Sequence, residues 1–183
     1  MRAYERFLNY VVVNTRSDDT SATYPSSACQ FDLAKLLVEE MRALGIADAR
    51  SDEFAYVYGT LPATPGYEQA ETVILQGHID MVCVKTPDCP IDMAKEGLDI
   101  THDGRYVFAK GTTLGGDDGI AVAYALALLD DTSIPHPPLE IIITVDEEIG
   151  MEGAAGVDLS MLKGRTLVNL DSEDEGIFTV SCA

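Results

Sequence analysis

Three short apolar runs constrain the fold of this chain more than any other feature. They cover residues 72–76, 139–145 and 166–170, and hardly any polar residue interrupts them. Runs of this kind are typical of strands that are covered on both faces. Residues 119–129 are apolar almost all round, which predicts a buried helix between the first two strands. We therefore expect an α/β fold, a three-layer sandwich with a largely parallel central sheet.

The rest of the chain adds smaller elements to this plan. Apolar residues at helical spacing predict an amphipathic helix over residues 4–12 and a second helix that stops at Gly45. The loop of residues 21–27 is expected to supply the N-cap of the second helix. Residues 54–61 alternate like a strand, and residues 87–108 are rich in turn residues. We expect that last segment to form a hairpin or an extended loop.

Composition sets limits on partners and location. The chain has 183 residues, 46% of them hydrophobic, which suits one soluble globular domain. Its formal net charge of −19 argues against a nucleic-acid partner, because phosphate binding needs the opposite sign. No apolar run is long enough to span a membrane, and the first residues have no apolar signal core. We expect a cytoplasmic protein without a membrane partner.

Each predicted strand is followed immediately in the sequence by acidic residues or a histidine. His78 and Asp80 follow the first strand, residues 146–148 follow the second, and Asp171 opens an acidic stretch after the third. Ligands of an open parallel sheet bind outside the carboxyl ends of its strands. These side chains are therefore expected to meet at one edge of the sheet, although they lie far apart in the sequence.

The glycine-rich segment of residues 111–119 leads into the predicted buried helix and belongs at the same edge. Such a loop can cradle phosphate through its backbone N–H groups. Here Asp117 and Asp118 would repel phosphate, and no lysine follows as in a P-loop. A cation site is the better interpretation, since a helix N-terminus favours an ionised carboxylate. The alternative is that Asp118 caps the helix while Asp117 turns towards the site.

One imidazole and several carboxylates form a donor set that suits zinc, or less selectively manganese or cobalt. His78 and Asp80 are two residues apart, so they point to the same side of an extended backbone. Asp80 can then accept the second ring N–H of His78. Of the neighbours Glu147 and Glu148, one can bind metal while the other acts as a general base on bound water.

Residues 73–82, with Gly77-His78-Ile79-Asp80 at their centre, resemble the first metal motif of the di-zinc exopeptidases. This family includes peptidase T, carboxypeptidase G and the aminoacylases. Residues 110–120, together with 170–176 and 181–183, are most similar to its aminoacyl-histidine dipeptidase branch (Xaa-His dipeptidase, peptidase D). The first 66 residues look more like peptidase T.

This resemblance implies a role for each site residue. His78 and Asp171 would bind one zinc ion, Glu148 would bind the second, and Asp117 would bridge both. Asp80 would orient His78, and Glu147 would be the general base. The resemblance also implies a cis peptide bond between Asp117 and the next residue. The implied reaction is hydrolysis of small peptides, dipeptides of the Xaa-His type, by a water between the metals that Glu147 activates.

Two alternatives remain beside this interpretation. One is a tripeptide aminopeptidase of the peptidase T type, and the other is a non-catalytic metal-binding fragment. Members of the family have a further histidine ligand beyond an inserted lid domain that forms the homodimer, and neither His102 nor His136 is a convincing substitute. We therefore expect residues 1–183 to be the N-terminal part of the catalytic domain, without the lid and dimerisation domain and the C-terminal catalytic segment.

Overall fold

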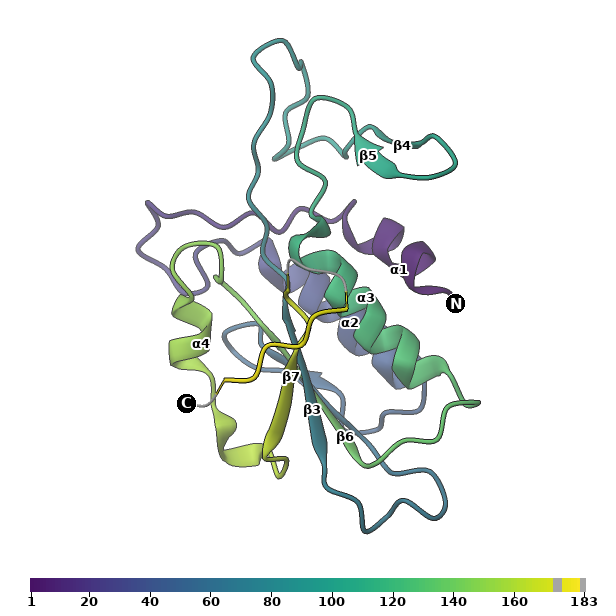
Figure 1. Ribbon diagram of the computed structural model, residues 1–183. Coiled ribbons are helices and arrows are strands. Elements are labelled where there is room, and N and C mark those ends of the chain that lie inside the picture. The colour runs from purple at the N-terminus through teal and green to yellow at the C-terminus, as the bar shows by residue number, and fades with distance from the viewer. Residues whose placement is uncertain (173–175, 182–183) are drawn as a thin grey trace.

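The computed structural model describes residues 1–172 and 176–181. A five-stranded sheet lies at its centre, with helices on both sides (Figure 1). The helices are α1 (Ala3–Tyr10), α2 (Gln30–Ala43), α3 (Gly116–Asp130), α4 (Glu152–Gly156) and a 3-10 turn (Leu159–Met161). The strands of the sheet are β1 (Arg50–Ser51), β2 (Val57–Leu61), β3 (Val73–His78), β6 (Leu139–Thr144) and β7 (Thr166–Asn169).

The strand order in the sheet is β1-β2-β6-β3-β7. Strand β3 runs parallel to both β6 and β7, whereas β2 runs antiparallel to β1 and β6. The largely parallel α/β fold predicted from the three apolar runs is therefore confirmed. In the register of β3 and β6, His78 lies opposite Thr144, so the two strands end level with each other. The residues that follow them begin at the same edge of the sheet.

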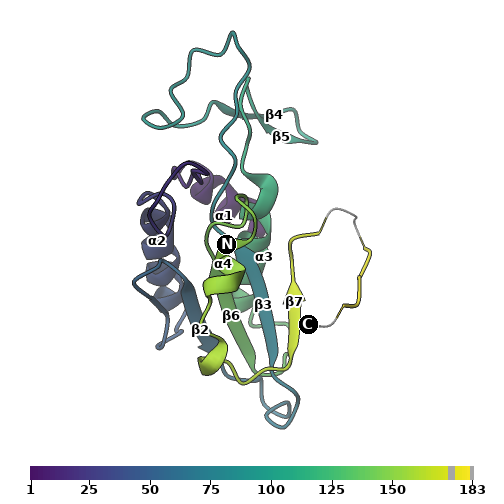
Figure 2. The ribbon, with the colours of Figure 1, turned by 90° about the vertical axis from the view of Figure 1, so that its left-hand side faces the viewer.

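The helices α1, α2 and α3 cover one face of the sheet, and α4 lies against the other (Figures 1 and 2). Helix α3 packs between β3 and α1. It buries residues on several sides, among them Ala121, Val122 and Leu126. Strand β6 is buried along its whole length because it has a neighbour on either side and helices on both faces. The expected buried helix and the three-layer arrangement are both present.

The prediction that residues 166–170 form a strand covered on both faces is wrong: β7 is the last strand in the sheet order and is mostly exposed. Two other local predictions are also wrong, for identifiable reasons. The loop of residues 21–27 does not cap α2, which is preceded by Cys29 and has no side-chain cap. The Ser26 hydroxyl in that loop instead donates to Asp146. Strand β2 begins at Val57 rather than at residue 54, because the Asp52 carboxylate accepts backbone N–H bonds from the next residues and closes a turn.

The excursion of residues 87–108 stands away from the sandwich and ends in a small hairpin (Figure 1). Its strands are β4 (Ile100–His102) and β5 (Val107–Ala109), which pair antiparallel. The Asp103 carboxylate accepts two backbone N–H bonds inside the turn, and Gly104 has the positive φ of 93° that the turn requires. The predicted hairpin is confirmed. In the part of the chain that the structure describes, no helix has the length and apolar character to cross a membrane.

Candidate metal centre

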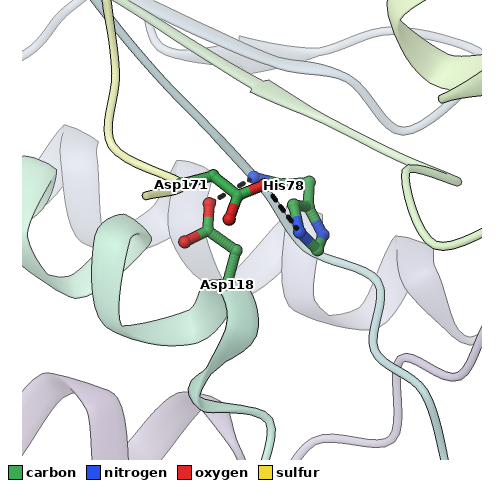
Figure 3. Close-up of side chains that lie close together, drawn as sticks. All are labelled: His78, Asp118 and Asp171. Carbon is green, nitrogen blue, oxygen red and sulfur yellow. Dashed lines mark hydrogen bonds and ion pairs between the residues drawn. The ribbon is translucent and has the colours of Figure 1, made fainter. Parts of the chain in front are cut away.

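His78 is the last residue of β3, and its side chain is fully buried at the carboxyl edge of the sheet. Three carboxylates from three other segments surround its Nε2 atom. Asp117 Oδ1 lies at 3.0 Å, Asp171 Oδ2 at 3.7 Å and Glu147 Oε2 at 3.9 Å. Figure 3 shows Asp171 and Asp118 approaching His78 from different elements. The predicted convergence of residues that follow different strands is therefore observed.

Asp80 connects the imidazole to the segment that follows β6. Its carboxylate is buried and lies 3.2 Å from His78 Nδ1. The same carboxylate accepts the backbone N–H of Glu147 at 3.0 Å and that of Glu148 at 3.1 Å. One side chain thus holds both the ring of His78 and the backbone that carries the two glutamates. Sequence reasoning anticipated the first of these contacts but not the second.

The peptide bond between Asp117 and Asp118 is cis, as the family resemblance implied. The two aspartates reach His78 from different sides. Asp117 approaches Nε2, whereas Asp118 Oδ2 accepts the backbone N–H of His78 at 3.1 Å. No side chain caps the start of α3, so the alternative that Asp118 acts as the helix cap is wrong. A Cβ on Gly77 would lie 2.7 Å from Asp118 Oδ2, and glycine at this position leaves room for that contact.

The potential ligand atoms lie close enough to one another to bind metal ions in place of their present hydrogen bonds and ion pairs. Two groups have ligand atoms that all lie within 4.8 Å of one another: His78 with Asp118 and Asp171, and His78 with Asp117 and Glu148. Imidazole and carboxylate donors suit zinc, manganese or cobalt. Asp118 belongs to one of these two groups, although it was not among the predicted ligands. Its position beside Asp117 in the glycine-rich loop was the available signal, but an aspartate at the start of a helix is equally compatible with a capping role.

Electrostatics favour the binding of a cation. Burial lowers the pKa of His78, but the hydrogen bond to Asp80 and the surrounding carboxylates outweigh this and raise it to about 9. Burial raises the pKa of Asp118 to about 7, with further contributions from the neighbouring aspartates. Burial, together with nearby carboxylates, also raises the pKa of Glu147 and of Glu148. These carboxylates repel one another, and a bound cation would relieve that repulsion.

The other histidines lie away from this cluster. His102 is exposed in β4, and His136 is half-buried with its Nδ1 atom 2.8 Å from the carbonyl oxygen of Pro137. Neither belongs to the metal-ligand groups found among residues 1–172 and 176–181. The acidic residues Glu173, Asp174 and Glu175 and the terminal Cys182 and Ala183, which contributed to the family resemblance, lie outside the described residues.

A polar cavity of about 370 Å³ adjoins the cluster. It is lined by residues 16–19, Val82, Cys83, Glu148 and Ile149. The cavity places open space beside a carboxylate of the cluster.

Comparisons with known proteins agree with this geometry. The sequence model of the family described as Peptidase family M20/M25/M40 matches residues 74–175. The chain is 46% identical over 122 residues to the cytosol non-specific dipeptidase of Escherichia coli (strain K12), a match that covers 67% of this chain and 25% of that protein. It is 30% identical over 205 residues to peptidase T of Alkaliphilus oremlandii (strain OhILAs), covering 94% of this chain and 49% of that protein.

Among solved structures, aminoacylhistidine dipeptidase from Vibrio alginolyticus superposes with a TM-score of 0.81 at 39% identity. That match covers 95% of this chain and 33% of the other. The chain thus spans between a quarter and a half of the length of these relatives.

Proposed function

Since the chain belongs to peptidase family M20/M25/M40, we propose that it carries the metal-binding and catalytic residues of a metallo-exopeptidase. Residues 1–183 would form the N-terminal part of the catalytic domain. The name of the Escherichia coli relative, a cytosol dipeptidase, supports a cytoplasmic location and small peptides as substrates. A homodimer stays an expectation that rests on the family resemblance.

The observation that carries this proposal is the ring of carboxylates around His78 Nε2. In our proposal His78 and Asp171 would hold one zinc ion, Glu148 would hold a second, and Asp117 would be a ligand of both. The donor set supports zinc, although manganese and cobalt accept the same donors. When bound, the metal ions would polarise the scissile carbonyl and lower the pKa of a water molecule.

Glu147 is the proposed general base. Its carboxylate lies 3.9 Å from His78 Nε2, close to where the attacking water would be held. The raised pKa of Glu147, caused chiefly by burial, brings this carboxylate nearer to the working pH, where a base transfers protons best. In the first step the carboxylate takes a proton from the attacking water while the water oxygen bonds to the scissile carbonyl carbon. In the second step the carbon–nitrogen bond breaks, and Glu147 returns the proton to the nitrogen of the leaving amine.

We propose dipeptides of the Xaa-His type as substrates, which the similarity to the Vibrio alginolyticus aminoacylhistidine dipeptidase supports. Tripeptides are the second candidate, because the peptidase T match extends over 94% of this chain, against 67% for the dipeptidase match. An assay of Ala-His against a tripeptide such as Ala-Ala-Ala separates the two. Rates that are equal on both substrates would overturn the assignment to the Xaa-His branch.

The role of Glu147 is tested by Glu147→Gln, with Glu71→Gln at an exposed position as the matched control. We expect the first variant to bind zinc within a few-fold of wild type and to hydrolyse the peptide about a hundredfold more slowly. Unchanged hydrolysis would exclude Glu147 as the base. A folded wild-type chain that binds zinc but hydrolyses neither peptide would support the non-catalytic alternative, and one that binds no zinc would overturn the whole proposal.

A further inference from the structure

Asp146 is the first residue of the Asp-Glu-Glu sequence, yet it belongs to neither metal-ligand group among the described residues. Its side chain is fully buried, and it accepts three hydrogen bonds from a segment more than a hundred residues earlier. The donors are the backbone N–H of Ser26 at 2.7 Å, the Ser26 hydroxyl at 2.5 Å and the Gln30 amide at 2.7 Å. A buried carboxylate is costly unless donors surround it, and here they do.

The backbone at Asp146 makes this contact important for the site. Asp146 has a φ of 49°, the left-handed conformation that a residue other than glycine seldom adopts. This reversal at the end of β6 turns the chain so that Glu147 and Glu148 face His78. Two buried carboxylates therefore hold the turn. Asp80 binds the N–H groups of the two glutamates, and the Asp146 side chain anchors the residue before them.

Ser26 also connects Asp146 to a residue that lines the adjoining cavity. The Ser26 hydroxyl accepts the backbone N–H of Asp18 at 3.0 Å while it donates to Asp146. Asp18 and Glu148 both line this cavity. A continuous chain of hydrogen bonds thus runs from the cavity wall through Ser26 to the turn that carries the glutamates.

We propose that Asp146, with Ser26 and Gln30, is a positioning residue that sets the placement of Glu147 and Glu148 relative to His78. The inference rests on the proposed function, because it assumes that a metal binds beside His78. The hydrogen-bond partners of the Asp146 carboxylate are Ser26 and Gln30, not the residues around His78 Nε2. Its effect passes through the backbone of the turn, so its loss should change the metal site even when the fold survives.

Strand β6 offers a matched control at its other end. Glu140 is also buried, at 3% exposure, and its carboxylate accepts backbone N–H bonds from Lys163 and Gly164. It lies six residues before Asp146, a distance of about 20 Å along an extended strand. The substitutions Asp146→Asn and Glu140→Gln each neutralise one buried, hydrogen-bonded carboxylate. Asparagine also tolerates the left-handed backbone, so the first substitution tests the charge rather than the conformation.

The test is titration of the purified chain and both variants with Co²⁺, followed by visible absorption, with a thermal melt of each metal-free sample. We expect both variants to melt at a lower temperature than wild type. Only Asp146→Asn should bind Co²⁺ about tenfold more weakly and with a changed absorption spectrum, as when residues that support metal ligands are lost. Should that variant not fold, Ser26→Ala removes one donor, and a smaller loss of affinity with the same spectral change is expected.

The outcomes separate this inference from the proposal on which it rests. A wild-type chain that is folded but binds no Co²⁺ would overturn both. A wild-type chain that binds Co²⁺, together with Asp146→Asn and Ser26→Ala variants whose affinity and spectrum equal those of Glu140→Gln, would overturn the positioning role alone.

Discussion

Two clusters of charged side chains, each built around a buried cationic side chain, differ in their charge balance. In the helical layer, the Arg6 side chain from α1 is only 2% exposed and lies between Glu40 of α2, at 3.1 Å, and Asp130 of α3, at 2.8 Å. The N-terminal amine also contacts Asp130. Two positive groups thus meet two negative ones, and the cluster joins three helices. This balance is what a structural ion-pair network requires.

At the carboxyl edge of the sheet, negative side chains greatly outnumber positive ones. One imidazole lies among six carboxylates: Asp80, Asp117, Asp118, Glu147, Glu148 and Asp171. Within the residues that the structure describes, no lysine or arginine forms an ion pair with Asp117, Asp118, Glu147 or Glu148. The comparison teaches that clustered charge is structural where positive and negative groups neutralise each other. An excess of one sign indicates a site that needs an external ion.

Removing Arg6 should have the largest effect on stability. We expect Arg6→Met to lower the free energy of unfolding by about 3 kcal/mol, because two carboxylates lose their buried partner and the helices lose their common contact. Urea denaturation measures this loss. Zinc affinity of the folded variant should stay within a few-fold of wild type. A large loss of affinity would show that the two clusters are not independent.

Removing His78 should strongly reduce zinc affinity, whereas removing Arg6 chiefly reduces stability. We expect His78→Ala to weaken zinc binding by at least about a hundredfold, which corresponds to about 2.7 kcal/mol. Isothermal titration calorimetry measures the affinity. The controls are His102→Ala and His136→Ala, which remove histidines outside the cluster and should bind zinc like wild type. Loss of zinc binding in either control would show that the zinc site includes that histidine and is not the cluster around His78.

Zinc binding should displace the proton of His78. The pKa of this imidazole is about 9, raised from its ordinary value of 6.5, so the ring is protonated at neutral pH in the metal-free chain. Zinc affinity should therefore rise about tenfold for each pH unit up to pH 9, provided that one proton leaves per ion. The same proton stabilises the metal-free fold below pH 6.5, and this contribution is lost as the pH rises through 9. Titration calorimetry in buffers of different ionisation enthalpy counts the protons, and no release would contradict this prediction.

Replacing one acidic residue by its amide should change the stability of the metal-free chain in opposite directions in the two clusters. At pH 8, above the Asp118 pKa of about 7, we expect Asp118→Asn to stabilise the metal-free chain by about 1 kcal/mol, because it removes a charge that burial opposes. Glu40→Gln should destabilise it by about 1 kcal/mol, since the Arg6 guanidinium loses a charged partner. Thermal or urea unfolding gives both values. Equal signs would contradict the distinction between the clusters.

The sequence was sufficient to predict the residues that gather at the sheet edge. Parallel strands end at one edge, so His78, Glu147 and Asp171 could be placed together from three apolar runs alone. The glycine-rich loop added Asp117, and the family predicted from these motifs is the one that the comparisons identify. The ligand and base roles of these residues stay predictions.

Contacts between distant segments could not be predicted in the same way. No local pattern indicates that the Ser26 hydroxyl binds Asp146 rather than capping α2, because the two residues are 120 positions apart. Nor does a pattern show that Asp118 would bind the backbone of β3. In each case a polar side chain had a plausible local partner and a distant one, and burial in the folded chain favoured the distant one.

The carboxylate of Asp80 also bears on how the site behaves in motion. Thermal fluctuations shift neighbouring strands against each other, and groups attached to separate strands would then drift apart. Here the ring at the end of β3 and the two amides beyond β6 bind one side chain. A displacement of either strand end is therefore transmitted to the other. The spacing between His78 and the glutamates should vary less than the positions of the strands that carry them.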